Sequence, residues 1–134
     1  MIFFHIEKGN ERRFGKAVLT VETDTKGRIL DHDTRFSTLV GRSREELYLR
    51  ALNELRHEDM PSNICNVHHL RLENTPLFWR GIIKFKAGFD DYFWAKVFIR
   101  QAEYVRGMRS FVYILQSPSR REVKLAEKLY RRLA

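Results

Sequence analysis

Two short stretches of this chain carry the side chains best suited to binding a ligand. A turn-like stretch contains an amide, a guanidinium, an imidazole and a carboxylate, contributed by Asn53, Arg56, His57 and Asp59. Further along the chain, Trp79 supplies a large flat aromatic ring close to a glycine. Edge hydrogen bonds, a counter-charge and a stacking surface are what a planar, partly charged organic cofactor requires. These residue types therefore suit a binding site for a cofactor of that kind.

Each of these side chains also has an ordinary structural explanation. Asp59 can cap the helix that follows, Arg56 can pair with a nearby acid, and the backbone can satisfy His57. Trp79 can be a core aromatic at the start of a sheet. The residue types alone leave both interpretations open.

No catalytic constellation accompanies these residues. The chain has no Ser-His-Asp nucleophile elbow, no phosphate-binding loop and no dinucleotide-binding glycine pattern. The spacing of its acids and histidines does not indicate general acid–base chemistry. We therefore expect that the protein is not an enzyme. Cys65 is the single cysteine, which excludes an intramolecular disulfide and a cysteine-rich zinc site.

Length and composition indicate one globular domain. The chain has 134 residues, of which 43% are hydrophobic and 13% aromatic, enough for a single core. No apolar run approaches the roughly 20 residues that span a bilayer. The apolar start is interrupted at His5 and Glu7, too soon for a secretory signal. We expect a cytoplasmic protein without direct membrane insertion.

Much of the net charge of +8 lies near the C-terminus. The cations there are opposed only by Glu122 and Glu127, and they are Arg120, Arg121, Lys124, Lys128, Arg131 and Arg132. This pattern is typical of the solvated face of a helix. The chain contains no zinc-finger, helix-turn-helix or aromatic RNA-binding motif. We therefore expect no nucleic-acid partner.

The elements that must position the candidate residues begin with a sheet. Apolar and β-branched patterns predict strands at 17–23, 28–32, 77–87, 92–105 and 108–116. The first two are joined by a turn at Gly27, which predicts a hairpin. Two strands and then three more predict a five-stranded antiparallel sheet.

Helical patterns separate the two groups of strands. A first helix ends at Gly41 as its C-cap residue. A capping box over residues 43–46 opens a second helix, whose apolar side continues to Leu55. Met60–Pro61 begins a third helix, and a final helix follows residues 117–119. The order predicts an α+β fold with the short helices packed on one face of the sheet.

This order of elements resembles the PAS fold, and several motifs agree with it. The usual PAS opening is matched by Asp24, Gly27 and Ile29, by Phe36, Leu39 and Gly41, and by Ser43, Glu45, Glu46 and Leu47. The resemblance covers about residues 17–134 and implies the α+β PAS fold described above.

A closer resemblance is to the FAD-binding N-terminal sensory PAS domain of bacterial aerotaxis receptors. Those domains carry an Asn-x-x-Arg-His-Pro-Asp-Met-Pro signature, matched here by Asn53, Arg56, His57, Asp59, Met60 and Pro61. Their Trp-x-Gly motif, followed by two aliphatics and a lysine, is matched by Trp79, Gly81, Ile82, Ile83 and Lys84. An aromatic-Trp pair and a Leu-Tyr pair in the tail are matched by Phe93–Trp94 and Leu129–Tyr130.

The resemblance implies an FAD site at these positions. Asn53 and Trp79 are expected to line the pocket. Arg56, His57 and Asp59 are expected to form one turn that bears the ligand or supports its pocket.

Two departures from the family pattern bear on this site. Asp33 stands where those receptors usually have an asparagine, and a carboxylate can accept from the flavin imide N–H but cannot donate to a carbonyl. Glu58 replaces the first proline of the signature, so the turn is less rigid and gains a carboxylate.

Two alternatives to a flavin sensor remain open. One is a ligand-free PAS interaction module whose pocket is filled by its own side chains. The other is a haem b gas sensor, in which His68 or His69 on the third helix is the axial ligand. Apart from that haem site, no metal site is expected.

The resemblance also implies a role in signal transduction. The chain divides into an N-terminal arm or cap at 1–16, the PAS domain at 17–117 and a signalling or packing helix at 118–134. Such a module would report redox or oxygen status to a downstream domain or protein. The helix carries an apolar stripe that must pack on its own sheet, a second copy or the next domain, formed by Val123, Ala126, Tyr130 and Leu133. We expect a homodimer, because PAS modules often pair through flanking helices and an aromatic sheet face.

Overall fold

The computed structural model describes residues 9–60 and 79–133, with the backbone alone for Trp79 and Leu133. Its strands are β1 Leu19–Thr23, β2 Ile29–His32, β3 Trp79–Ala87, β4 Asp91–Glu103 and β5 Arg109–Gln116. Its helices are α1 Thr34–Val40, α2 Arg44–Leu47, the 3-10 helix η1 Leu52–Leu55 and α3 Arg120–Leu133. The strands match the predicted ones to within about two residues at their ends. The third helix, predicted to begin at Met60–Pro61, lies outside the described residues.

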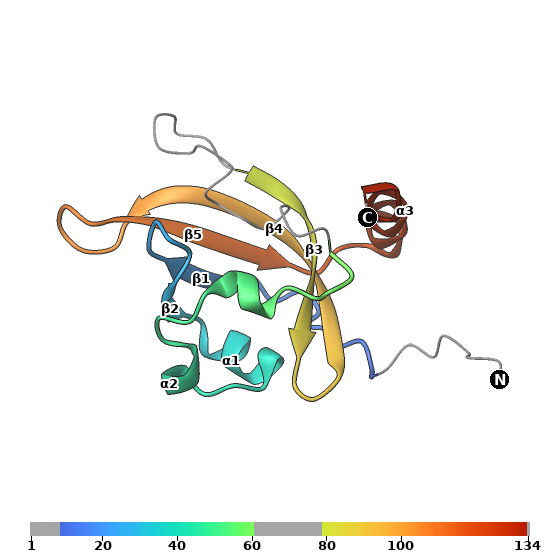
Figure 1. The fold of residues 1–134 in the computed structure, drawn as a ribbon, viewed down its shortest axis with the longest axis horizontal. Coiled ribbons are helices and arrows are strands. Elements are labelled where there is room, and N and C mark those ends of the chain that lie inside the picture. Colours follow the sequence, from blue (N-terminus) through green and yellow to red (C-terminus); the bar gives the residue numbers. More distant parts are fainter. Residues whose placement is uncertain (1–8, 61–78, 134) are drawn as a thin grey trace.

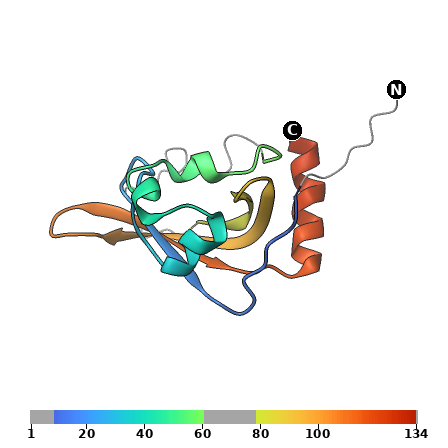
Figure 2. The ribbon, with the colours of Figure 1, turned by 90° about the horizontal axis from the view of Figure 1, so that it is seen from below.

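The strands form one antiparallel sheet in the order β2-β1-β5-β4-β3. This confirms the predicted five-stranded antiparallel sheet. Helices α1, α2 and η1 lie together, and the β3–β4 hairpin stands between them and α3 (Figure 1). Figure 2 shows α3 as a separate column beyond the curved end of β3 and β4.

Alternation along the strands divides the sheet into a core-facing side and an outer side. Val21, Tyr113 and Ile99 are register partners on three neighbouring strands, and all three are buried. The rings of Phe85 and Phe93 stack on the same side with their centroids 5.1 Å apart. Helices α1, α2 and η1 cover this side with the buried side chains of Phe36, Leu39, Val40, Leu47, Leu52 and Leu55.

The helix ends follow the predicted capping signals, but the second helix is shorter than predicted. Gly41 ends α1 with a φ of 72°, and the predicted capping box opens α2. The prediction that α2 continues to Leu55 is wrong. Leu49 has a φ of 62°, and its N–H donates to the carbonyl of Ile29 at 2.7 Å. Backbone pairing with the start of β2 therefore interrupts the helix before η1.

The segment before β1 runs beside the first part of β4. The N–H of Arg12 donates to the carbonyl of Tyr92 at 2.7 Å, and the N–H of Tyr92 donates to the carbonyl of Asn10 at 3.1 Å. The Arg12 guanidinium also donates to the carboxylate of Asp91 and to the carbonyl of Leu39. The described part of the predicted N-terminal arm is therefore extended and fixed to the sheet.

Helix α3 packs on the outer side of the β3–β4 hairpin. Val123, Ala126 and Tyr130 are buried, and the Tyr130 hydroxyl donates to the carbonyl of Ile82 at 2.5 Å. Of the three surfaces considered for this stripe, the protein's own sheet is therefore the one it contacts. Within the described ranges, no helix is long and apolar enough to cross a membrane.

Candidate functional site

The turn from Asn53 to Met60 is attached to an edge of the sheet. β3 is an edge strand, and Arg56 forms an isolated antiparallel bridge with Phe85. The N–H of His57 donates to the carbonyl of Lys84 at 2.8 Å. These bonds use backbone groups that an edge strand otherwise leaves open. They also fix where the side chains of the turn lie relative to the sheet.

The turn is held together by its own side chains. Arg56 donates from Nε to Asn53 Oδ1 at 3.3 Å and from Nη1 to the carbonyl of Met60 at 2.6 Å. The N–H of Asp59 donates to His57 Nδ1 at 3.1 Å. The structure thus brings together the four polar residues that the sequence analysis selected in this stretch. The Arg56 guanidinium spans the turn and bonds to its two ends.

A buried lysine completes the cluster. Lys84 is only 6% exposed, and its Nζ lies 2.9 Å from Asp59 Oδ2. The same nitrogen lies 4.4 Å from the centroid of the Tyr92 ring and 5.8 Å from that of Trp94. A carboxylate and two aromatic faces are the surroundings that stabilise a cation removed from water. Lys84 belongs to the matched motif after Trp79, but the sequence analysis did not select it as a site residue.

The surroundings of His57 favour the neutral form of its imidazole. Its side chain is 19% exposed, and its ring meets that of Tyr92 edge-on at 6.2 Å between centroids. Burial, and next the positive charge of Lys84, lower the pKa of the imidazole, against smaller opposite effects of Asp59 and Glu58. Because Nδ1 accepts the backbone N–H of Asp59, the hydrogen of the neutral ring is assigned to Nε2.

The cluster faces the outer side of the sheet. Lys84 pairs in register with Trp94, and both alternate along their strands with the core residues Ile83, Phe85 and Phe93. The contacts that the structure gives for the His57 and Asp59 side chains are therefore on the side where α3 lies. If a ligand binds on the core-facing side, His57 and Asp59 could contribute to its site by supporting the turn.

Asp33 is not part of this cluster. It is the N-cap residue of α1, beside β2 at the opposite edge of the sheet from β3. Its carboxylate accepts from the Arg35 N–H at 2.8 Å and from the Arg35 guanidinium at 3.0 and 2.6 Å. The hydrogen bond from the Arg35 side chain is the main reason why the pKa of Asp33 is lowered to about 2.

Three other predicted site residues, Trp79, His68 and His69, lie at the edge of the described ranges or outside them. The backbone of Trp79 opens β3 opposite Ile99, which confirms the strand but not the role of the indole. His68 and His69, named for the haem alternative, lie outside the described residues. Elsewhere in the described chain, no three His, Cys, Asp or Glu side chains are grouped so that they could hold a metal ion.

His32 is a candidate that the sequence analysis missed. It is 8% exposed, and its Nδ1 lies 2.9 Å from the carbonyl oxygen of Asp33. A carbonyl can only accept, so Nδ1 carries a hydrogen, and in the neutral tautomer with that hydrogen Nε2 is an acceptor. In residues 9–60 and 79–133, Nε2 is the only buried side-chain nitrogen or oxygen without a hydrogen-bond partner. Such an atom is uncommon in a folded protein and marks a place where a donor is missing.

The side on which His32 lies could not be read from the sequence. Simple alternation from Ile29 places His32 on the opposite side of the strand. The pairing of β1 with β2 is irregular between Glu22 and Thr23, so Thr23 pairs with Ile29 whereas Val21 pairs with His32. Both Ile29 and His32 are therefore buried on the core-facing side. The His32 ring lies 6.0 Å from that of Phe36 on α1, between centroids.

Comparison with solved structures agrees with this architecture. The chain is similar to the PAS domain of an HTR-like protein from Haloarcula marismortui, with a TM-score of 0.64, 14% identity, and coverage of 75% of this chain and 81% of that one. It is similar to the LOV domain of the blue-light photoreceptor Aureochrome1 in its light state, with a TM-score of 0.65, 18% identity, and coverage of 84% and 91%. A PAS domain from a two-component sensor histidine kinase gives a TM-score of 0.58, 11% identity, and coverage of 75% and 85%.

No protein-family profile matches the chain. At these identities the structural similarity defines the fold and not the ligand. The five-stranded sheet, the short helices on one side and the C-terminal helix form a PAS fold.

Proposed function

We propose that this chain is a sensory PAS module of signal transduction that binds FAD and reports redox or oxygen status. The observation that carries the proposal is His32 Nε2, which has no hydrogen-bond partner among the described residues and is buried on the side of the sheet that the short helices cover. The isoalloxazine ring of FAD carries an imide N–H, which is a donor of the kind that this nitrogen lacks. The match of the turn from Asn53 to the FAD-binding signature supports the same ligand.

In this proposal His32, and not Asp33, accepts the hydrogen bond from the flavin imide N–H. The Asp33 carboxylate is already occupied by the backbone and guanidinium of Arg35. His32 is held with Nδ1 toward a carbonyl, so the lone pair of Nε2 has a fixed direction before any ligand arrives. When bound, FAD would supply a redox-active ring whose hydrogen-bonding pattern changes on reduction.

The proposed output follows backbone contacts from the turn to α3. The His57 N–H bonds to the carbonyl of Lys84, and the carbonyl of Ile82 on the same strand accepts from the Tyr130 hydroxyl. A change in the position of the turn would thus reach α3 through a single edge strand. The strand and the helix would then have two packings in equilibrium. A ligand shifts this equilibrium only if it binds one packing better than the other.

The test is FAD bound per chain after purification and after reconstitution with excess FAD. We expect the two absorption bands of oxidised flavin, and an FAD affinity about threefold to tenfold weaker in His32→Ala, because one hydrogen bond is lost. Asp33→Asn is the matched control and should retain the affinity of the unchanged protein. Equal affinities for all three proteins would exclude His32 as a flavin ligand.

A ligand-free interaction module is the second candidate. It is favoured by the direct stacking of Phe85 on Phe93 and by the burial of the side chains on the core-facing side. A colourless protein that takes up no FAD on reconstitution would support it. A red protein with a dominant Soret band would support the haem alternative.

We also propose that the chain pairs with a second copy and passes its signal to a downstream domain or protein. The outer side of the sheet beyond α3 carries partly exposed apolar side chains that could meet a second copy, namely Phe98, Val112 and Ile114. Sedimentation of the full chain beside one truncated after Pro118 would test this. Monomers at tens of micromolar for both would reject the dimer.

A further inference from the structure

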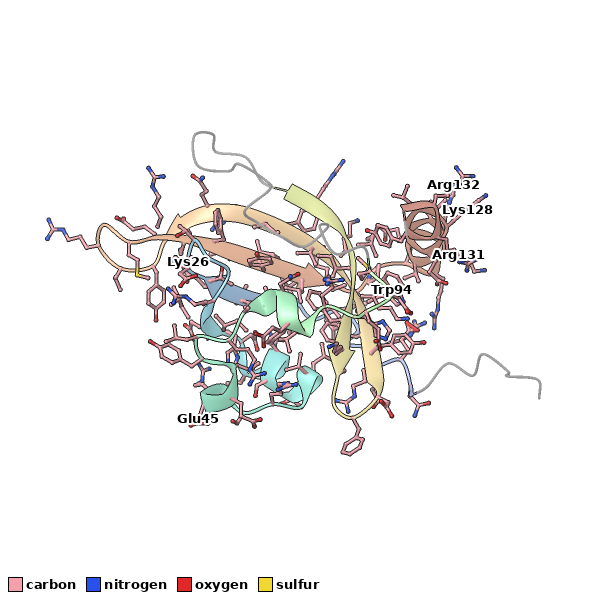
Figure 3. The ribbon with its side chains drawn as sticks, in the orientation of Figure 1. Lys26, Glu45, Trp94, Lys128, Arg131 and Arg132 are labelled. Atoms are coloured by element: carbon pink, nitrogen blue, oxygen red, sulfur yellow. The ribbon has the colours of Figure 1, made fainter. Side chains whose placement is uncertain are left out.

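Helix α3 has two different long sides. One is its buried stripe of Val123, Ala126 and Tyr130, which is bound to the sheet. The other is exposed and carries the cations Arg120, Arg121, Lys124, Lys128, Arg131 and Arg132. Figure 3 shows Lys128, Arg131 and Arg132 projecting from the part of α3 that is turned away from the sheet. We call this exposed side the cationic face of α3.

No carboxylate of the helix interrupts the cationic face. At about 3.6 residues per turn, Glu122 and Glu127 lie at the two margins of the buried stripe. Glu122 is bound there by Lys96 at 3.0 Å and by the backbone of Ser119. Glu127 lies 3.7 Å from Arg131, which remains 79% exposed. Among the described residues, the positive charge of the face is therefore mostly uncompensated.

Two exposed leucines lie along one margin of the cationic face. Leu125 is 59% exposed and Leu129 is 53% exposed. They are four residues apart, so they lie one above the other on the same line of the helix. Neither contributes to the stripe that holds α3 on its own sheet.

The positive surface continues past the start of α3. A cavity of about 250 Å³ there is lined by Arg13, Arg120 and Trp94, among other residues. Glu11 pairs with Arg120 at 2.8 Å and lies 3.9 Å from Arg13. Two guanidiniums thus share one carboxylate, and the edge of the cavity keeps a positive surplus.

We propose that the cationic face of α3, with Leu125 and Leu129, docks on an anionic phospholipid bilayer. A helix lying at a membrane surface places cations among the headgroups and a few apolar side chains at the boundary with the acyl chains. A second copy fits less well, because a two-fold contact opposes like charges. Two leucines also bury far less than the roughly 800 Å² per partner of a stable interface.

A nucleic-acid partner would account for the cations but not for the two exposed leucines. Docking requires no detachment of α3, since its buried stripe faces the other way.

The test is co-sedimentation of the full chain with vesicles of phosphatidylcholine, alone or mixed with phosphatidylserine. We expect binding only to the mixed vesicles, and weaker binding as salt is added. Each cation near an anionic surface changes partitioning by about fivefold, so Lys128→Gln, Arg131→Gln and Arg132→Gln together should weaken it by about a hundredfold. Leu125→Gln with Leu129→Gln should also weaken binding, while circular dichroism shows that both variants fold.

The matched control removes the same amount of charge from another part of the molecule. Lys26 lies away from α3 in Figure 3. Arg106 belongs to the β4–β5 loop, which lies at the opposite end of the sheet from α3 in Figure 1. Lys26→Gln and Arg106→Gln, combined with Arg109→Gln, should leave vesicle binding within about twofold of the unchanged protein. Equal losses in the two triple variants would overturn the proposal, because net charge alone would then explain binding. The proposal would also be overturned, in favour of a nucleic-acid partner, if the full chain did not bind mixed vesicles at low salt but did bind duplex DNA.

Discussion

Lys84 and Asp59 form an ion pair across the edge of the sheet, with Lys84 Nζ 2.9 Å from Asp59 Oδ2. The lysine side chain is 7% exposed and the aspartate side chain 65% exposed. The pair therefore joins a buried cation on β3 to a carboxylate on an exposed turn. It holds the Asp59 part of the turn to the edge strand β3, and Tyr92 and Trp94 complete the surroundings of the lysine on the outer side of the sheet.

Removing the carboxylate of this ion pair should destabilise the fold. We expect Asp59→Asn to lower the free energy of unfolding by about 1 to 2 kcal/mol, since the buried lysine loses this carboxylate while solvent screens part of the effect. Lys84→Met should cost less, because it removes the buried charge as well. Urea titrations of both variants and of the double variant give the coupling energy. A coupling near zero would show that the pair does not hold the turn.

The N-cap of α1 should make stability depend on pH in the acid range. Folding lowers the pKa of Asp33 from 3.8 to about 2, so the unfolded chain binds more protons between these values. The stabilisation is therefore present above about pH 4 and is lost as the pH falls toward 2. Melting temperatures from pH 5 to pH 2 should fall less steeply for Asp33→Asn than for the unchanged protein. The same slope in both proteins would contradict the assignment.

His57 should contribute a second pH dependence, nearer neutrality. Its pKa is lowered by burial and by Lys84, so below its ordinary value of 6.5 the unfolded chain takes up the proton first. The stabilisation is complete above that value and is lost as the pH falls through the lowered pKa. Imidazole proton shifts followed by NMR should give a midpoint below 6.5. His57→Gln should flatten the stability profile in this window, and an unchanged profile would reject this origin.

Gly88 should resist substitution far more than Gly107, although both have positive φ. A Cβ on Gly88 would collide with Nη2 of Arg12, whereas a Cβ on Gly107 meets nothing within 4 Å among the described residues. Gly107→Ala should cost about 1 kcal/mol from the backbone conformation alone. Gly88→Ala should cost about 1 to 3 kcal/mol more, because Arg12 must leave Asp91 and the carbonyl of Leu39. Equal losses in urea would show that the arginine adapts freely.

Local signals in the sequence were enough to predict the order of the described strands and helices and the five-stranded antiparallel sheet. The glycine at 41, the capping box at 43–46 and the alternation along the strands each act through neighbouring residues, so a pattern can be recognised without knowing the tertiary structure. The apolar stripe of α3 was recognised for the same reason. Its partner was not, since several surfaces can bury such a stripe.

Contacts between distant residues decided what the sequence left open. The bond from Leu49 to Ile29 ends the second helix early, and the irregular β1–β2 pairing turns His32 toward the core. Attachment to β3 places the side chains of His57 and Asp59 on the outer side of the sheet, next to a lysine that lies far along the chain. Alternation reveals that a strand has two sides, but only the packed structure determines which side is covered and by which residues.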